Sequence, residues 1–366
     1  MTKCILQLIP SLDRAGAEKQ MALLAAGLPR DEFDVHVCAL TRGGPVENDL
    51  RKAGIPYCVI GKRWKVDPQA FRRLRRHVAR LRPDLIHAWM LAANAYGLAA
   101  ARACGIQHIV AAQRCADPWK STLQRTADRL IAWQVDCLLT NSAGVRDFYL
   151  QNGLPPEKFR VIANGVPLPG PTGTTRGQLL GELGLAEGSR LIGLVGRLWP
   201  QKRVKDAIWA ADLLKVIRKD THLLIIGDGP QRDRLLKFRD QVRIADQVHF
   251  LGRRDDVPRM MPHFDVVWST SGYEGQSNAI LEAMAAGVPV VATDIPGTRE
   301  LVLPNETGHL VSVGDRAGLA RRTNQLLDDP GQAGKFGAAG RKHVAERFSV
   351  DKMVEQHAKL YRELLG

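Results

Sequence analysis

The hydrophobic residues of the chain occur mainly in short, nearly continuous runs, and the stretches between these runs carry apolar residues at helical spacing. Continuous runs rich in Ile, Val and Leu are typical of parallel strands that are covered on both faces. In the first half, the predicted strands are residues 4–9, 34–40, 57–60, 85–90, 109–113, 137–140 and 161–163. In the second half, they are residues 191–195, 223–226, 248–251, 265–268, 289–293 and 309–311. The alternation of such strands with helices predicts an α/β fold with two doubly wound parallel sheets.

A segment rich in proline and glycine separates the two series of strands. Residues 167–175 read Pro-Leu-Pro-Gly-Pro-Thr-Gly-Thr-Thr, which is the most linker-like stretch of the 366 residues. We expect a first Rossmann-like domain over residues 1–168, a second over residues 169–348, and a C-terminal helix over residues 349–366 that could return to the first domain. Ligands of such sheets bind beyond the carboxyl ends of the strands, so the two domains are expected to face one another across a cleft.

The composition is that of an ordinary globular protein, except for its charge. Hydrophobic residues make up 45% of the chain and charged residues 25%, which are average values. The formal net charge is +14, and residues 1–170 hold 24 basic against 14 acidic residues, an excess of 10. Partners with negative charge are therefore expected to bind mainly to the first domain.

The six cysteines lie in the first half without a C-x-x-C pair, which indicates reduced thiols and a cytoplasmic protein. Asp13 and Arg14 interrupt the first apolar run before a signal-peptide core is complete. The longest weakly polar stretch, residues 90–101, is too short to span a bilayer. We therefore expect a cytoplasmic protein that could bind peripherally to the inner face of the cytoplasmic membrane.

A helix is predicted over residues 278–286, directly after a buried strand. Ser277 is a suitable N-cap and Gly287 a suitable C-terminal stop. The amide groups and the positive dipole end at the helix start favour an anion such as phosphate. Glu282 lies in the otherwise apolar helix and needs hydrogen-bond donors, which sugar hydroxyls could supply, and Glu274 is a second carboxylate nearby. Alternatively, Glu282 pairs with a protein arginine and Glu274 is a solvated loop residue.

A strand ending in Gly196 is followed by two cations. Gly196 permits close approach of a ligand to the backbone, Arg197 can bind phosphate oxygens in a fork, and Lys202 adds a point charge. Together they are typical of a diphosphate clamp. Basic loop residues that merely face water are the simpler interpretation of either residue alone.

These motifs resemble glycosyltransferase family 4, whose members have the GT-B fold. An E-x7-E element with the continuation E-A-M-A-x-G-x-P-V-V-A-T covers residues 274–293, and G-R-L-x3-K covers residues 196–202. The resemblance implies a retaining, metal-independent transfer of a sugar from a UDP- or GDP-linked donor to a glycan or lipid-linked acceptor, with no other cofactor. The absence of a D-x-D motif agrees with the absence of a metal.

The resemblance also implies roles for individual residues. Arg197 and Lys202 would bind the donor diphosphate, with Glu274 on the hydroxyls of the transferred sugar. The other donor-binding residues that it implies are Gly16, Gly196, Arg254 near the base, Ser277 and Asn278 at the phosphate, and Glu282 on the ribose.

The chain departs from the family pattern in two places. Many members carry a His after the strand 109–113, whereas this chain has Arg114, which cannot act as a general base but can orient a phosphate or an acceptor. We place Arg114 and His87 on the acceptor side, although His87 could instead be a structural residue. Arg203 stands where members usually have Gly, and we expect only a change in loop shape.

Other classes of protein share part of the pattern. A non-hydrolysing nucleotide-sugar epimerase would have the same fold but would turn over the donor without an acceptor, and a non-catalytic nucleotide-binding protein is also compatible. A dinucleotide oxidoreductase needs G-x-G-x-x-G after a first strand, which this chain lacks. Charge alone does not indicate nucleic-acid binding, because no aromatic repeat or recognisable module accompanies it.

A second basic feature is the predicted helix over residues 71–82. Its apolar stripe is expected to pack on the sheet, while six arginines occupy the rest of its surface. Each basic residue near an anionic bilayer contributes about 1 kcal/mol of binding free energy. We therefore hypothesise that this helix rests on the membrane and presents the cleft to the acceptor.

Overall fold

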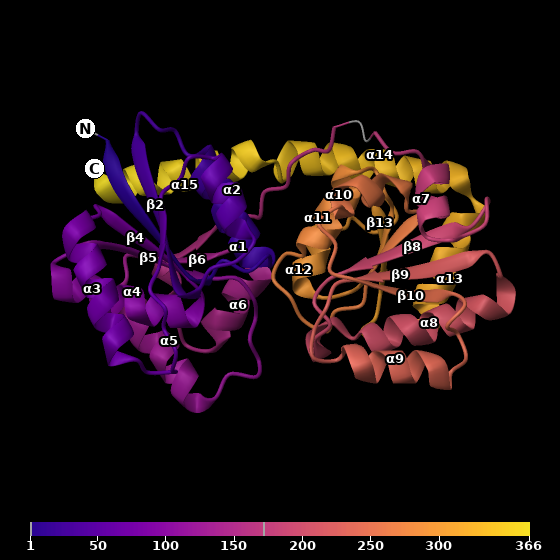
Figure 1. The fold of residues 1–366 in the computed structure, drawn as a ribbon, viewed down its shortest axis with the longest axis horizontal. Helices are drawn as coiled ribbons and strands as arrows, with labels where there is room; N and C mark the ends of the chain where they lie inside the picture. The colour runs from indigo at the N-terminus through magenta and orange to yellow at the C-terminus, as the bar shows by residue number, and fades with distance from the viewer. Residues whose placement is uncertain (1, 171–172) are drawn as a thin grey trace. The chain divides into compact units, whose positions relative to one another are not determined.

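The computed structural model describes residues 2–170 and 173–366, so Pro171 and Thr172 of the expected hinge lie outside the described residues. The chain divides into two compact units (Figure 1). The first comprises the described residues up to Gly165 together with Val350–Gly366, and the second comprises Val166–Ser349. Both units are parallel α/β structures, which confirms the predicted fold class.

In the described part of the first unit, seven strands form one parallel sheet in the order β3-β2-β1-β4-β5-β6-β7. The elements are β1 (Lys3–Ser11), α1 (Gly16–Gly27), β2 (Phe33–Arg42), α2 (Val46–Lys52), β3 (Tyr57–Val59), α3 (Pro68–Leu81), β4 (Leu85–Trp89), α4 (Met90–Cys104), β5 (His108–Gln113), α5 (Thr122–Gln134), β6 (Cys137–Thr140), α6 (Ala143–Gln151), a 3-10 helix (Pro156–Lys158), β7 (Phe159–Val161) and α15 (Val350–Leu365).

Helices cover both faces of this sheet, as continuous apolar strands require. Alternate residues of β1 enter different cores: Ile5 and Ile9 pack with α1, α2 and α15, whereas Leu6 and Leu8 pack with α3, α4 and α5. The same two layers are visible in the left-hand unit of Figure 1. One helix layer therefore carries the arginine-rich α3 and the other carries the C-terminal helix.

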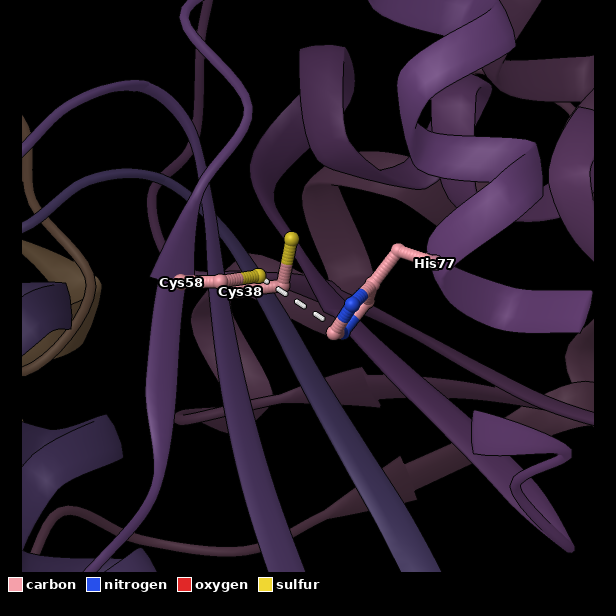
Figure 2. Close-up of side chains that lie close together, drawn as sticks. All are labelled: Cys38, Cys58 and His77. Atoms are coloured by element: carbon pink, nitrogen blue, oxygen red, sulfur yellow. Dashed lines mark hydrogen bonds between the residues drawn. The ribbon is translucent and has the colours of Figure 1, made fainter. Parts of the chain in front are cut away.

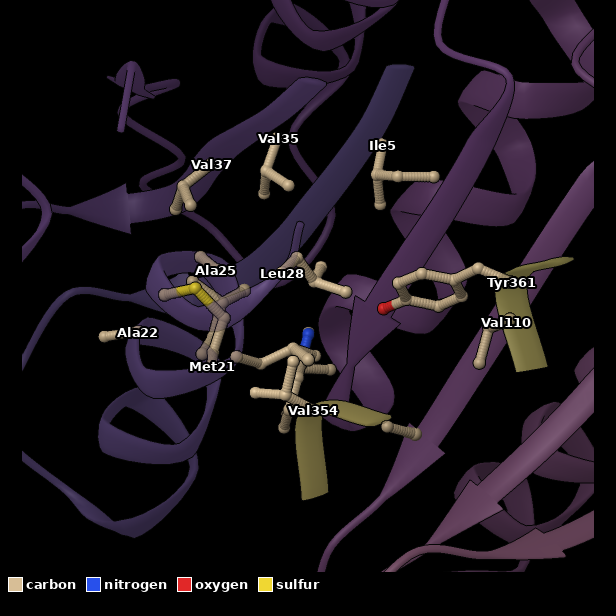
Figure 3. Packing of buried hydrophobic residues seen from close by; sticks show 14 of the residues in the cluster. Ile5, Met21, Ala22, Ala25, Leu28, Val35, Val37, Val110, Val354 and Tyr361 are labelled. Carbon is tan, nitrogen blue, oxygen red and sulfur yellow. The ribbon is translucent and has the colours of Figure 1, made fainter. Parts of the chain in front are cut away.

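The C-terminal helix α15 belongs to the core of the first unit. Val354 lies beside Met21 and Leu28 in Figure 3, and all three are buried. A Cβ atom added at Gly27 would lie 2.6 Å from Val354 Cγ2, so the glycine allows α1 and α15 to approach closely. The Tyr361 hydroxyl is also buried and accepts a hydrogen bond of 3.0 Å from Gln7 on β1.

In the described part of the second unit, six parallel strands have the order β10-β9-β8-β11-β12-β13. The elements are α7 (Arg176–Glu182), β8 (Arg190–Val195), a 3-10 helix (Pro200–Lys202), α8 (Val204–Ile217), β9 (Thr221–Ile226), α9 (Arg232–Gln241), β10 (Val248–Gly252), α10 (Val257–Met260), a 3-10 helix (Met261–His263), β11 (Val266–Ser269), α11 (Asn278–Ala285), β12 (Val290–Thr293), α12 (Pro296–Arg299), β13 (Gly308–Val311), α13 (Arg316–Asp328) and α14 (Pro330–Arg347).

The strand order places a topological switch point in each sheet. In the second unit, the chain leaves β8 towards β9 on one side and returns as β11 on the other. Ligands of doubly wound sheets bind beyond the carboxyl ends of the strands at this point. The loops that follow β8 and β11 are those that carry the predicted clamp and the first predicted carboxylate.

Each predicted strand overlaps an observed strand, with ends that differ by at most two residues. In β2 the difference arises because the polar residues Thr41 and Arg42 extend the strand beyond its apolar run. No helix in residues 2–170 and 173–366 combines the length and apolar character needed to cross a bilayer.

Candidate active site

Hydrogen bonds tie together the loops after β8 and β11 at the switch point of the second unit. The Thr270 hydroxyl donates to the Lys202 carbonyl at 2.7 Å, and the Gly272 amide donates to the Gln201 carbonyl at 2.8 Å. The Gln201 side chain donates in turn to the Tyr273 carbonyl at 2.8 Å. These contacts hold the two loops in a fixed relation, so residues about 70 positions apart in sequence meet at one place.

Lys202 and Glu274 form an ion pair within this arrangement. Lys202 Nζ donates to Glu274 Oε1, and the Ser271 hydroxyl donates to the same carboxylate oxygen. The Glu274 side chain is only 9% exposed and that of Lys202 is 22% exposed. The Thr293 hydroxyl, at the end of β12, anchors Ser271 through its carbonyl at 2.6 Å. The resemblance implied separate contacts for the two charged residues, whereas here they neutralise one another.

The Arg197 side chain is exposed, and its guanidinium carbon lies 5.5 Å from the centre of the Trp199 ring. Among the residues that the structure describes, Arg197 has no ion-pair partner. Its charge is therefore available to an incoming anion. This differs from Lys202, whose charge is already matched by a carboxylate.

At Gly196, the atoms that approach the backbone closely belong to the protein itself. A Cβ atom added at Gly196 would lie 3.4 Å from Lys202 Cε, so the lysine stem passes over this residue. On the neighbouring strand, Gly227 has a φ of +138°, and a Cβ atom there would lie 1.9 Å from the Gly196 carbonyl oxygen. The glycines let two strand ends approach one another beneath the lysine. Room for a ligand at Gly196 would require Lys202 to move.

The helix α11 begins at the predicted residue, Asn278, and ends at Ala285, one residue earlier than predicted. Ser277 is the N-cap, and its hydroxyl makes no capping hydrogen bond. Gly287 follows the C-cap with a φ of +76°, the left-handed conformation expected of a glycine stop. Ile280, Leu281, Ala283 and Met284 are buried and anchor the helix. Its amide-bearing end, with Asn278 in the first turn, adjoins the loop that contains Glu274, while Glu282 is half-buried.

Arg254 follows β10 and is bound to a neighbouring carboxylate. Its Nε and Nη2 atoms donate to the two oxygens of Asp256 at 2.8 and 2.6 Å. Arg259 donates to the same carboxylate at 2.8 Å. The Arg254 guanidinium holds the pKa of Asp256 well below its usual range. The predicted contact of Arg254 with the base of the donor stays a prediction, and any such contact starts from a guanidinium that is already paired.

Arg203 does more than alter the loop shape. Its φ of +49° is in the left-handed region, where a non-glycine residue costs about 1–2 kcal/mol. Its Nε donates to Asp206 at 2.7 Å, and Asp206 accepts a second bond of 2.8 Å from Arg316 on α13. The arginine therefore links the loop after β8 to the starts of α8 and α13.

In the first unit, Gly16 is the first residue of α1, which has no side-chain cap. Arg114 directly follows β5. Its guanidinium donates to Asn164 and lies 4.9 Å from the centre of the Trp89 ring. Burial lowers the pKa of Arg114 to about 9, so the side chain stays charged at neutral pH. A cation held over an aromatic ring is suited to orient an anion, and its acceptor-side role stays a prediction.

His87 is buried in this structure, and its placement on the acceptor side stays a prediction. Its side chain is 0% exposed, and its Nδ1 atom lies 2.7 Å from the Tyr361 hydroxyl. The ring stacks on Trp89 at 4.7 Å. Burial lowers the pKa of His87 well below its ordinary value. The imidazole lies between the sheet and α15, where these contacts favour the structural alternative.

The sequence did not predict a buried polar network that lies beside Arg114. Lys120 Nζ donates to Asp128 and to the Tyr149 hydroxyl, both at 2.8 Å, and Gln113 donates to Asp128 at 2.9 Å. The Lys120 and Asp128 side chains are 3% and 2% exposed. The network fixes both ends of the loop that contains Arg114. The available signal was a lysine eight positions before an aspartate.

Two Rossmann-like units, the second with cations and a carboxylate at its switch point, define the GT-B class of proteins. The family model described as "Glycosyl transferases group 1" matches residues 176–343, and that of "Glycosyltransferase Family 4" matches residues 14–168. The chain belongs to glycosyltransferase family 4, which confirms the resemblance.

Individual relatives agree with this membership. The chain is 33% identical over 189 residues to N-acetyl-alpha-D-glucosaminyl L-malate synthase of Bacillus anthracis, a match that spans 51% of the chain and 49% of that relative. It is 30% identical to glycogen synthase of Mycobacterium tuberculosis, over 76% of the chain and 69% of that protein. It is 24% identical to UDP-Gal:alpha-D-GlcNAc-diphosphoundecaprenol alpha-1,3-galactosyltransferase of Escherichia coli, over 92% and 91%.

Among solved structures, HepE of Anabaena in complex with UDP-glucose superposes with a TM-score of 0.90. The two chains are 24% identical over 99% of this chain and 100% of HepE. At this identity the similarity demonstrates the GT-B fold and nothing finer.

Proposed function

We propose that this chain is a retaining glycosyltransferase that moves a sugar from a nucleoside diphosphate sugar to an acceptor hydroxyl in glycan or polysaccharide biosynthesis. The observation that carries the proposal is the contact between Lys202 and Glu274 at the switch point of the second sheet, beside the start of α11. The cation and the helix end can bind a phosphate, and the carboxylate beside them can accept hydrogen bonds from hydroxyls. Together they suit a phosphate joined to a polyhydroxylated group.

In the proposed reaction, the bond between the anomeric carbon and the diphosphate oxygen breaks, and negative charge grows on the leaving diphosphate. Arg197, Lys202 and the first amides of α11 would stabilise this charge as fixed electrostatic donors. The acceptor oxygen attacks on the face that the diphosphate leaves, and its proton passes to a departing phosphate oxygen. All six cysteines lie in the first unit, so the second unit supplies no thiol as a covalent nucleophile.

The ion pair gives the proposed site a way to couple diphosphate binding to sugar recognition. When the donor phosphate draws the Lys202 ammonium towards itself, the Glu274 carboxylate loses a donor. Its side chain is 9% exposed, so water replaces that donor poorly. Sugar hydroxyls are the natural replacement. The site would then favour a complete nucleotide sugar over a nucleoside diphosphate.

The similar proteins favour a uridine-linked donor over a guanosine-linked donor. HepE has been crystallised with UDP-glucose, and the Escherichia coli relative is named for a UDP-linked galactose. We therefore place UDP-linked sugars first, with GDP-linked sugars as the second class to be tested.

The acceptor is proposed to be lipid-linked and reached from the inner face of the cytoplasmic membrane. The Escherichia coli relative is named for a diphosphoundecaprenol acceptor. In the first unit, α3, α4 and α5 form one layer (Figure 1), and Arg72, Arg75 and Arg76 are exposed on α3. The same layer exposes large apolar side chains on and before α5: Trp119 62%, Leu123 80%, Leu130 60% and Trp133 65%. Arginine with tryptophan is typical of surfaces that rest at a membrane interface.

The experiment is to incubate the purified protein with a panel of UDP- and GDP-linked sugars, with and without lipid-linked and free glycan acceptors. Release of nucleoside diphosphate and the configuration of the new linkage, followed by nuclear magnetic resonance, are the readouts. Transfer with retention supports the proposal. Inversion, isomerisation of the donor without acceptor, or binding of the nucleotide without any turnover would each replace it with another function.

A further inference from the structure

Two cysteines and a histidine lie together at the edge of the first sheet. None of them belongs to the predicted donor or acceptor residues. Cys38 on β2 and Cys58 on the edge strand β3 are direct neighbours in the parallel register. His77, on α3, completes the group, and Figure 2 shows the three side chains close together. Their sulfur and ring nitrogen atoms all lie within 4.8 Å of one another.

The spacing of Cys58 and His77 is that of two ligands on a common metal ion. Cys58 Sγ lies 3.5 Å from His77 Nε2. Two ligands of a tetrahedral Zn²⁺, with Zn–S of about 2.3 Å and Zn–N of about 2.0–2.1 Å, are separated by about 3.6 Å. The distance between Cys58 and His77 therefore already fits a shared ion, and Cys38 lies within 4.8 Å of both.

Burial and element order favour a defined site over a chance encounter of side chains. Cys38 is 0% exposed and belongs to the core beneath α3, while Cys58 and His77 are half-buried at the sheet edge. The rear of the group is therefore enclosed by the core, and its front is partly exposed, as entry of an ion and a water ligand require. All six cysteines lie within the described residues and are free thiols.

The chemistry of the side chains also suits a thiophilic cation. Binding of a divalent ion would displace the thiol protons to solvent and leave two thiolates and an imidazole as ligands.

We propose that Cys38, Cys58 and His77 form a binding site for a thiophilic divalent cation, with Zn²⁺ as the expected occupant and water as the fourth ligand. Two thiolates and an imidazole select Zn²⁺ over the hard cations Mg²⁺ and Ca²⁺. The bound ion would fasten the edge strand β3 to β2 and to α3. It would thereby stabilise the layer that carries the exposed arginines.

The test measures Zn²⁺ bound to the reduced full-length protein by equilibrium dialysis and elemental analysis, at one ion per chain if the proposal holds. Co²⁺ in place of Zn²⁺ reports the ligands directly, because thiolate-to-cobalt charge transfer and intense visible bands identify a tetrahedral site with sulfur ligands. Circular dichroism of every variant establishes that it is folded. Enzymatic activity is not needed as a readout.

C58S and H77Q are the informative variants, since both positions are half-buried and tolerate polar replacements. Each should weaken Zn²⁺ binding by more than about tenfold, because tenfold is already the cost of losing a residue that only hydrogen-bonds to a metal ligand. C104S, on α4 and outside the group, is the matched control and should bind like the parent protein. C4S tests the neighbouring group formed by Cys4, Asp34 and His36.

Several results would overturn the proposal. They are the absence of bound Zn²⁺ in the reduced protein, unchanged binding by C58S and H77Q, or loss of the ion in C4S instead. A protein that binds no ion but loses two hydrogens on oxidation, with Cys38 and Cys58 cross-linked in its mass spectrum, would identify the pair as a redox couple and exclude the metal site.

Discussion

Lys202 and Glu274 serve two purposes at once, because their ion pair stabilises the loops that the proposed chemistry uses. Removing one partner leaves the other charge poorly hydrated, and breaking buried pairs in this way costs about 3–5 kcal/mol. With 9% and 22% exposure of the two side chains, the cost here should be below that range. We predict that K202M lowers both thermal stability and turnover, the latter by about 10²-fold or more. Denaturation curves and steady-state kinetics measure the two effects separately.

The double variant K202M/E274Q separates these effects, because it leaves no unpaired charge. It should recover most of the stability lost in K202M but none of the turnover. R197A is the matched control, since Arg197 is exposed without an ion pair and should lose about 10²-fold in turnover at unchanged stability. Recovery of turnover in the double variant, or near-normal turnover in R197A, would contradict the clamp.

The two carboxylates near α11 should respond differently to neutralisation. We predict that E274Q reduces transfer more than it reduces the affinity for the nucleoside diphosphate, since Glu274 is assigned to the sugar. E282Q should weaken nucleoside diphosphate binding directly, since Glu282 is assigned to the ribose. Calorimetry with the nucleoside diphosphate alone, beside kinetics with the nucleotide sugar, distinguishes the assignments. Equal losses of affinity in both variants would refute the division.

At the scale of elements, local signals predicted α11 well. Its cap, its stop at Gly287 and its apolar residues are adjacent in the sequence, so no distant contact was needed. The partners of α15 could not be read in this way. His87 meets Tyr361 across 274 positions, and nothing near either residue identifies the other. The same limit hid the pairing of Lys202 with Glu274, although each residue was singled out.

The close approach of α1 and α15 predicts a specific coupling between two small residues. G27A should destabilise the first unit by about 1–3 kcal/mol, because its new methyl group would lie 2.6 Å from Val354 Cγ2. V354A removes that clash at the cost of a small cavity. In a double-mutant cycle followed by urea unfolding, G27A should therefore be less harmful, or even stabilising, in the V354A background. Additive effects would mean that the two helices separate freely.

Two buried histidines between α15 and the sheet should make the stability of the first unit dependent on pH. Burial lowers the pKa of His357 from 6.5 to about 4, and it also lowers that of His87. The unfolded chain binds these protons between pH 6.5 and 4 and the folded unit excludes them, so the free energy of unfolding falls as pH is lowered through this window. For His357 the loss is about 3 kcal/mol.

Urea unfolding at several pH values measures this dependence. H357Q, which keeps a neutral hydrogen-bonding side chain, should show a shallower decline than the parent protein over the same window. The remaining slope would be due mainly to His87 and to carboxylates. Identical pH dependence in H357Q and the parent would show that His357 is protonated without cost in the folded unit.

At the scale of the whole molecule, the sequence predicted the two-sheet architecture because hydrophobic periodicity reports burial on both faces of a strand. It also predicted that α3 would pack through an apolar stripe, and Leu74 and Val78 are indeed buried. It could not predict the aromatic surface on and before α5, since exposure of Trp119 and Trp133 depends on how the layer is assembled. The sequence also could not show which arginines are solvated and which form hydrogen bonds with the protein.

Arg73 illustrates that last distinction, which changes the membrane prediction. Its guanidinium donates to the carbonyls of Ile60 at 2.8 Å and Gly61 at 3.0 Å, so it fastens α3 to the chain after β3. R73Q should therefore lower stability. The residues assigned to the bilayer are Arg72, Arg75 and Arg76, together with the exposed tryptophans.

We predict that the protein sediments with anionic liposomes at low salt and much less with neutral liposomes or at high salt. The triple variant R72Q/R75Q/R76Q should lose about 3 kcal/mol of binding, about 1 kcal/mol per arginine. W119A/W133A should also weaken membrane binding. This loss should be similar at low and at high salt, because tryptophan binds by inserting into the membrane interface and not through charge. The matched control is R232Q/R234Q/K237Q on α9 of the second unit, where three exposed cations are removed without touching α3 or α5. An equal loss in that control would mean that net charge alone drives binding. Equal recovery of the parent protein with both kinds of liposome would leave a soluble acceptor as the better hypothesis.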